Sequence, residues 1–210
     1  MIGISYGITV CDESRELKEL LARLMPYVRP EDEVVILQDC VKTTPGVSEV
    51  IETVESYGDR VKRTAGFFYK DFGGWKNDLG TLCSKDWIFQ IDADELPSEH
   101  LLKTLSKILE VNTAELFWVP RINTVEGITT EDIQRWHWRV EEDGRVNWPD
   151  YQGRIYRNDP DRIKWVGKVH EHIEGAKTFA KLPLDDRYAL LHKKTIEKQR
   201  QQNSLYDALV

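Results

Sequence analysis

Apolar residues in the first half of the chain follow two alternating patterns, which predict strands and helices in turn. Continuous apolar or β-branched runs predict buried strands, and these cover 2–10, 33–39, 60–68 and 87–91. Between them, apolar residues recur every three or four positions, which predicts amphipathic helices over 13–25, 75–83 and 97–109, with a further one carrying Val47, Val50, Ile51 and Val54. Buried strands separated by such helices are typical of a mostly parallel sheet covered on both faces, so we expect an α/β fold.

The second half of the chain has a more irregular pattern. Shorter strands are predicted at 116–125, 135–140, 154–157 and 164–173, and a polar helix over 195–209. No internal repeat or low-complexity linker divides the chain. We therefore predict a single domain over 1–210, with a regular half at 1–115 and a mixed half, including the C-terminal helix, at 116–210.

Acidic side chains follow three of the predicted parallel strands. They are Asp12 and Glu13 after the first, Asp39 at the end of the second, and Asp92 and Asp94 after the fourth. The carboxyl ends of parallel strands meet at one edge of a sheet, where ligands of such folds bind. Two carboxylates separated by one residue suit a hard divalent cation such as Mg²⁺ or Mn²⁺. The alternative is that Asp92 caps the next helix and Asp94 is merely solvated.

Charge and composition disfavour nucleic acid as a partner and a membrane-spanning segment, and they favour a cytoplasmic location. The chain has 29 Lys and Arg against 36 Asp and Glu, a net charge of −7, which disfavours nucleic acid because its binding depends on neutralising phosphates. No apolar run reaches the roughly 18–20 residues needed to span a bilayer. The three cysteines form no C-x-x-C pair, which favours a reducing, cytoplasmic location.

Several motifs, in order along the chain, resemble family 2 glycosyltransferases of the GT-A fold. The core of the resemblance is 71–77 (DFGGWKN) followed by 86–95 (DWIFQIDADE), and 4–13 and 34–39 resemble the first two strands of that family. Segments 153–158 (GRIYRN) and 165–171 (WVGKVHE) resemble the signature of its bacterial LgtF-like and tetratricopeptide-linked branch. The resemblance covers nearly the whole chain.

The resemblance implies both a fold and an activity. The fold would be a three-layer α/β/α domain, with a nucleotide-binding half at 1–115 and an acceptor-side half at 116–210. The activity would be metal-dependent transfer of a sugar, with inversion, from a nucleotide-diphosphate sugar to an acceptor hydroxyl. The acceptor stays open among a glycan, a lipid-linked sugar, a protein side chain and a modified nucleobase.

Roles for individual residues follow from the same resemblance. The nucleotide-sugar set is Asp12, Glu13, Asp39, Lys76, Asn77, Asp92, Arg157 and Lys193, with the first three near the base or ribose and Lys193 beside the leaving diphosphate. The Mn²⁺ or Mg²⁺ ligands are Asp92, Asp94 and His192, with the histidine a metal or phosphate contact. Lys76 stands where the family usually has arginine, and a lysine cannot make arginine's bidentate contact.

The acceptor hydroxyl is a weak nucleophile, so the reaction needs a carboxylate as general base. Glu171 is the first candidate, because its His-Glu pair lies on the strand expected to line the acceptor side. Asp150 is the second candidate.

Other functions are compatible with parts of the pattern. A non-catalytic sugar- or nucleotide-binding module and a nucleotidyltransferase stay open, although no Gly-rich phosphate loop supports the latter. A phosphatase of the haloacid dehalogenase type would carry its D-x-D motif on the first strand, whereas here it follows the fourth. His170 and His172 would share one face of a strand and could form half of a transition-metal site.

Overall fold

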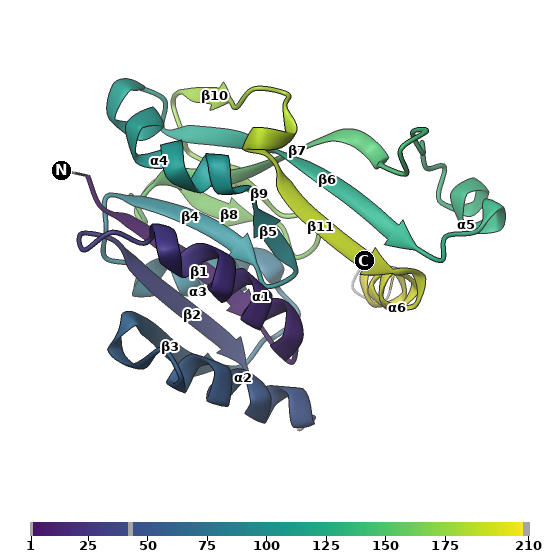
Figure 1. The fold of residues 1–210 in the computed structure, drawn as a ribbon, viewed down its shortest axis with the longest axis horizontal. Helices are drawn as coiled ribbons and strands as arrows, with labels where there is room; N and C mark the ends of the chain where they lie inside the picture. Colours follow the sequence, from purple (N-terminus) through teal and green to yellow (C-terminus); the bar gives the residue numbers. More distant parts are fainter. Residues whose placement is uncertain (1, 42–43, 208–210) are drawn as a thin grey trace.

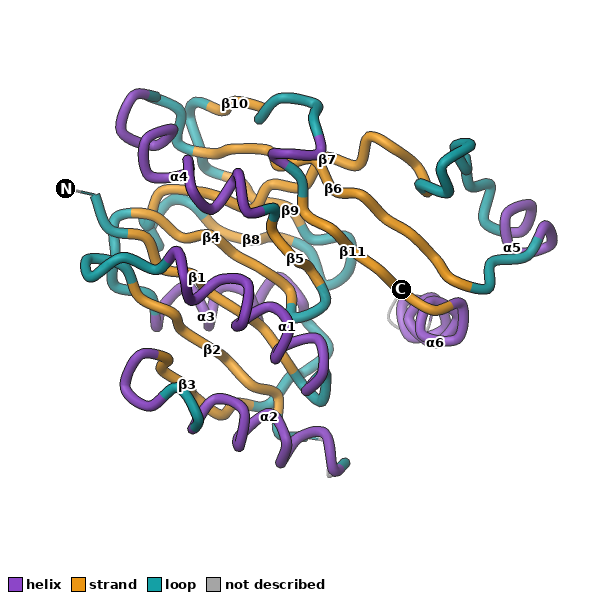
Figure 2. Tube along the Cα trace, viewed as in Figure 1, coloured by secondary structure: helices purple, strands orange, loops and turns teal. Residues whose placement is uncertain are grey.

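A computed structural model describes residues 2–41 and 44–207 of the chain. Its centre is a sheet in the order β3-β2-β1-β4-β7-β6-β11-β5, with β10 paired to β6, and a separate hairpin of β8 and β9 lies beside it. Figure 1 shows α1, α2 and α4 on the near face of the sheet and α3 behind it, and Figure 2 separates helices from strands in the same view. This arrangement confirms the predicted three-layer α/β fold with a mostly parallel first half.

The bounds of the elements follow the predicted order. The strands are β1 (Ile4–Val10), β2 (Glu33–Asp39), β3 (Val61–Gly66), β4 (Trp87–Asp92), β5 (Glu95–Pro97), β6 (Leu116–Glu126), β7 (Val146–Arg157), β8 (Lys164–Val166), β9 (His172–Glu174), β10 (Phe179–Lys181) and β11 (Leu190–Thr195). The helices are α1 (Ser14–Leu24), α2 (Pro45–Glu55), α3 (Phe72–Leu82), α4 (Glu99–Val111), α5 (Thr130–Arg135) and α6 (Ile196–Asp207), with single 3₁₀ turns at Met25–Tyr27, Gly58–Arg60 and Asp186–Tyr188. Positions 208–209 of the expected tail helix lie outside the described residues.

Strands β1 to β4 form the parallel half of the sheet. β1 pairs in parallel with both β2 and β4, and β2 with β3. The carboxyl ends of these strands therefore lie at one edge. The second half is mixed, because β7 pairs antiparallel with β4 and β6, while β11 runs parallel to β6 and antiparallel to β5.

Two apolar cores cover the two faces of the sheet. One lies under α1, α2 and α4, and takes alternate residues of β1, which are Ile4, Tyr6, Ile8 and Val10. The other lies under α3 and contains Trp75 and Leu79 together with Trp165 of β8. Thr9, between two residues of the first core, faces α3 instead, because successive side chains on a strand point to opposite faces. The end of β1 thus contributes to both layers.

Two expectations for the second half are wrong, and one strand there is not predicted. The segment 135–140 is not a strand, because α5 ends at Arg135 and only Val140 makes an isolated bridge to Val146. The segment 164–173 is two short strands, β8 and β9, so Glu171 lies in the loop between them and not on a strand. Strand β11, which carries His192, has too few apolar residues to be predicted from the pattern.

The loop that carries Glu171 is fixed to the beginning of α3 through the main chain. The amides of Phe72 and Gly73 donate to the carbonyls of Lys168 and Gly167 at 3.0 and 3.1 Å. A Cβ on Gly73 would lie 2.7 Å from the Gly167 carbonyl oxygen. Glycine at this position therefore permits the close approach that positions the loop against the beginning of α3.

No helix in the described part of the chain is long and apolar enough to cross a membrane.

Gly73→Ala is expected to lower the free energy of unfolding by about 1–3 kcal/mol, because the new methyl group overpacks against the loop. Gly80→Ala in the same helix is the matched control. Its Cβ would meet only Ile88, at 3.9 Å, so we expect it to raise stability by about 0.8–1 kcal/mol through helix propensity. Urea unfolding of both variants measures the difference, and equal effects of the two substitutions would contradict the packing argument.

Candidate functional site

The acidic residues at the ends of β1 and β2 help to shape the edge of the sheet. Glu13 folds back, and its Oε2 accepts from the amides of Cys11 and Asp12 at 2.8 and 3.1 Å. Asp12 accepts from the hydroxyl of Thr44, at the beginning of α2. Burial raises the pKa of Glu13 above its ordinary value. Both residues lie in the loop from β1 to α1, at the edge where a ligand of this fold binds.

Asp39 holds together two loops at the same edge. Its Oδ1 accepts from the amides of Val41 and Phe68 at 3.0 and 3.1 Å. The first amide follows β2 and the second follows β3, so one carboxylate links the chain beyond both strands. Asp39 therefore lies where the sequence predicts a nucleotide contact and also shapes that surface.

A chain of alternating charges, buried at its centre, connects β4, β5, β7 and β6. The Nη2 of Arg154 donates to Asp92 at 2.6 Å and to Glu95 at 2.7 Å. Glu95 also accepts from Arg121 at 2.9 Å, and Arg121 in turn pairs with Asp150 at 2.7 Å. The side chains of Arg154 and Glu95 are 3% and 0% exposed, so the contact between them lies away from bulk water, whereas Asp92 and Asp150, at 29% and 23%, are partly exposed.

Lys76 joins this network from α3. Its Nζ donates to Glu171 at 2.7 Å and lies 3.4 Å from Asp92 and 4.5 Å from the centroid of the Trp165 ring. Lys76 is buried, with 3% of its surface exposed. The ammonium group thus bridges Asp92 of the D-x-D motif and the candidate base, which come from distant parts of the sequence.

The network fixes the ionisation of both motif aspartates. Burial would raise the pKa of Asp92, but Arg154 and Lys76 outweigh it and hold that pKa far below its ordinary value. Burial would likewise raise the pKa of Asp94, but the adjacent imidazole of His192 and the charge of Lys194 lower it strongly. Both residues are therefore carboxylates throughout the ordinary pH range and can attract a cation.

β11 brings His192 and Lys194 to Asp94. The Nε2 of His192 lies 3.3 Å from Asp94 Oδ2, and its Nδ1 lies 2.7 Å from Asn123 Oδ1. Lys194, two residues further on the same face, lies 3.4 Å from the same Asp94 oxygen and donates to Gln202 of α6. Of the two adjacent lysines, Lys194 therefore reaches the motif.

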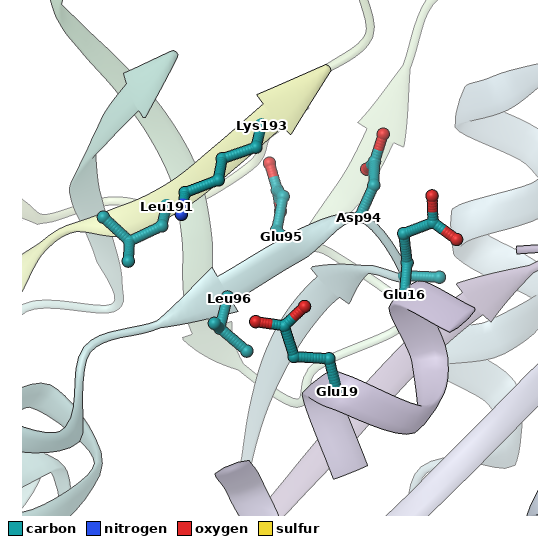
Figure 3. A pocket seen from close by; sticks show the side chains of 8 residues that line it. Glu16, Glu19, Asp94, Glu95, Leu96, Leu191 and Lys193 are labelled. Atoms are coloured by element: carbon teal, nitrogen blue, oxygen red, sulfur yellow. The ribbon is translucent and has the colours of Figure 1, made fainter. Parts of the chain in front are cut away.

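Lys193 faces the other side of β11. It lines a small pocket with Glu16 and Glu19 of α1 and with Asp94 and Glu95 (Figure 3). Its side chain is exposed and extends towards Leu191 in Figure 3. The structure thus brings Lys193 to the neighbourhood of Asp94, but on the α1 side, opposite His192 and Lys194.

Two residues predicted to contact the nucleotide sugar, Arg157 and Asn77, instead make structural contacts with tryptophans. Arg157 pairs with Trp87 at the beginning of β4 and stacks on its ring at 4.2 Å. Asp92 is five residues further along β4, roughly 16 Å away at the rise of a strand, so Arg157 is not brought to the cluster. Asn77 makes two hydrogen bonds with the main chain of Trp165, at 2.8 and 2.9 Å, which anchor β8 to α3.

Asp94 and His192 are the pair that suits a divalent cation. Their facing atoms are 3.3 Å apart, roughly the separation of adjacent ligands around an octahedral ion with bonds of about 2.1 Å. Within 2–41 and 44–207, no three His, Cys, Asp or Glu side chains form a group that could hold a metal. A cation at this pair would therefore take its other ligands from a substrate and water, as Mg²⁺ commonly does.

His170 and His172 do not lie on the same face of a strand. His170 lies in the loop before β9 with φ of 54° and contacts the Tyr206 ring. His172 is exposed and lies 3.0 Å from Glu174. The strand geometry that would support a transition-metal site is therefore absent at this pair.

Sequence reasoning missed Arg121 and Asn123, which link the two halves of the site. Both are polar residues inside a largely apolar strand, β6, and their presence there is the signal that could have drawn attention to them. Their directions depend on an irregularity in the β6–β7 register between these two residues. The pattern of a single strand contains no information on that register.

Comparison with known proteins supports the fold. No family model matches the chain, and no curated protein matches it. Among solved structures, S. aureus TarS 1–349 in complex with UDP-GlcNAc is similar to it with a TM-score of 0.62 and 16% identity, over 92% of this chain and 59% of that one. The same TarS segment in complex with UDP gives a TM-score of 0.61 at 16% identity, over 100% of this chain and 65% of that one. This chain thus spans less than two thirds of these TarS structures.

Arg154→Met is expected to lower the free energy of unfolding by about 3–5 kcal/mol, because it leaves Asp92 and Glu95 without the buried cation they share. Adding Glu95→Gln should restore part of the loss by removing one of the two negative charges. Urea unfolding measures both effects. Lys103→Met, which removes an exposed ion pair with Glu99, is the control and should change stability little. A loss for Arg154→Met no larger than that of the control would refute the role of the network.

Proposed function

We propose that this chain is a glycosyltransferase domain that takes a sugar from a nucleotide-diphosphate donor and transfers it to an acceptor hydroxyl, with a divalent cation at Asp94 and His192. The observation that carries the proposal is the meeting of these two residues with Lys194 beside the carboxyl end of β4. The similar TarS structures were determined with UDP-GlcNAc and with UDP, which supports a uridine nucleotide as the first donor to test.

The donor would bind along the carboxyl ends of the parallel strands. Asp39 and the loop with Asp12 and Glu13 lie on the base side, and the motif with Asp94 on the diphosphate side. A bound cation supplies charge stabilisation of the diphosphate oxygens. Lys194 adds a fixed positive charge beside the same group, where negative charge grows as the glycosidic bond of the donor breaks.

Lys76 is well placed to act near the phosphates, but it is already engaged with Glu171 and lies near Asp92. Its ammonium group is a compact, buried point charge and cannot make the bidentate contact of an arginine. Lys76 therefore contributes charge rather than shape to donor binding in this proposal.

Glu171 is the better candidate for the general base. Its side chain is 14% exposed, and among the described residues its ion-pair partner is Lys76. It lies in the loop that packs against Gly73. Asp150 accepts hydrogen bonds from Arg121, Asn123 and Gln152. Burial would raise its pKa, but Arg121 and Asn123 outweigh burial and lower it, which makes Asp150 a weaker base.

The finer features of the activity are proposals as well. We expect inversion at the anomeric carbon, since one base and one leaving group on opposite sides of the sugar suffice for a single displacement. The assignment to the bacterial LgtF-like branch stays a prediction.

UDP with Mn²⁺ at a hundredfold excess over its dissociation constant is expected to raise the free energy of unfolding by roughly 2.7 kcal/mol, because the ligand binds only the folded chain. Asp94→Asn should remove the part of this effect that depends on Mn²⁺, since it replaces a charged ligand of the cation by a neutral amide. Thermal unfolding and calorimetric titration, each with and without Mn²⁺, measure both results.

Asp143→Asn, in the exposed hairpin before β7, is the matched control and should bind like the unchanged chain. Binding of UDP that needs no Mn²⁺ and survives Asp94→Asn would contradict the metal-dependent transferase and favour a nucleotide-binding module. Product analysis with UDP-GlcNAc then tests transfer itself.

A further inference from the structure

A line of polar side chains runs from the candidate metal ligand into β6 and β7. His192 Nδ1 lies 2.7 Å from Asn123 Oδ1, and the Asn123 amide nitrogen donates to Asp150 Oδ2 at 2.8 Å. His192 and Asn123 lie opposite each other in the parallel pairing of β11 with β6. The contact is therefore built into the sheet and does not depend on a loop.

The direction of the Asn123 amide follows from the chemistry of Asp150. An ionised carboxylate can only accept hydrogen bonds, and Asp150 is held ionised by Arg121 at 2.7 Å. The NH₂ group of Asn123 must therefore face Asp150, which leaves its carbonyl oxygen facing His192. A carbonyl oxygen is only an acceptor, and so is the ionised carboxylate of Asp94 on the other side of the ring. The contact of Nδ1 with Asn123, at 2.7 Å, is a hydrogen bond, whereas Nε2 lies 3.3 Å from Asp94, so the proton of a neutral His192 belongs on Nδ1.

The same reasoning determines what the other ring nitrogen can bind. With the proton on Nδ1, Nε2 carries a lone pair and lies 3.3 Å from Asp94 Oδ2. A lone pair binds a cation, whereas a contact with a phosphate oxygen would require a proton on Nε2. The sequence left open whether His192 contacts metal or phosphate, and this geometry favours metal.

We propose that Asn123, itself oriented by Asp150, is a positioning residue that fixes His192 as the Nδ1–H tautomer and aims the Nε2 lone pair at the space beside Asp94. The inference rests on the proposed function for the identity of the cation. It assigns Asp150 a positioning role in place of the base role considered from the sequence. Partners of this kind behind a metal-binding histidine commonly set its orientation and its strength as a ligand.

The tautomer can be observed directly in the whole chain. With ¹⁵N-labelled histidine, two-bond ¹H–¹⁵N correlation spectra distinguish the two neutral tautomers, and His192→Gln identifies the His192 signals among the five histidines. The spectra are recorded at a pH high enough that the His192 signals no longer change with pH, so that only the neutral ring is observed. We expect the Nδ1–H pattern for His192, and the Nε2–H pattern would overturn the proposal whatever reaction the chain catalyses.

Asn123→Leu keeps a similar volume and removes the acceptor for Nδ1. The proton should then move to Nε2, where it can donate to Asp94, and the affinity for Mn²⁺ in the presence of UDP should fall 10- to 100-fold. Water-proton relaxation during titration with MnCl₂ measures that affinity. Gln152→Leu, which removes a different hydrogen bond to Asp150, is the control and should preserve the tautomer.

The outcomes separate this inference from the proposed function. An unchanged tautomer in Asn123→Leu would overturn the positioning role of Asn123, and failure of the unchanged chain to bind Mn²⁺ would overturn the cation role given to His192. Mn²⁺ binding that weakens in Asn123→Leu, without any sugar transfer by the unchanged chain, would support the positioning role and count against the transferase. Asp150→Asn, which no longer dictates the amide direction, should give a mixture of tautomers.

Discussion

The charge on Arg154 is the constraint on which the rest of the site depends. One buried guanidinium contacts the last residue of β4 and the first residue of β5, and it extends from β7, the strand that begins the mixed half of the sheet. Without that cation, the buried carboxylate of Glu95 and the partly exposed carboxylate of Asp92 would lie together with less positive charge between them, and leaving a buried charge unpaired costs several kcal/mol. The parallel half and the mixed half are thus joined by an ionic contact at the place where the chemistry is proposed, and the acidic motif keeps its shape because of it.

From this contact the network extends in two directions. Through Asp92 it reaches Lys76 and the loop of Glu171, and through Glu95 and Arg121 it reaches Asp150, Asn123 and finally His192. Most of these side chains come from strands and from α3, which gives them little freedom to move. Such preorganisation is what electrostatic stabilisation of a leaving group requires, because the charges are already in place before the reaction begins.

Much of the first half could be predicted from the sequence. The strands β1, β2 and β4 have apolar runs long enough to identify them, and their shared carboxyl edge brought Asp12, Asp39 and Asp92 together in the prediction. The second half could not be predicted as well. β5 and β9 have three residues each, which is too short for a periodic pattern, and β11 reads Leu-Leu-His-Lys-Lys-Thr, with polar residues on both faces. The partners of His192 depend on pairing between segments about seventy residues apart, which a single sequence does not specify.

The register of β11 against β6 has a wider consequence for how this edge could change. Because successive residues of a strand point to opposite faces, a slip of one position would turn Leu191 and Lys193 towards the motif and expose His192 to the helix side. The composition of the strand and its backbone hydrogen bonding would be nearly the same. A single residue inserted ahead of Leu190, if the connecting turn did not absorb it, would therefore put Leu191 in the place of His192 and exchange an imidazole for an aliphatic side chain beside Asp94, and it would also turn Leu190 out of the core.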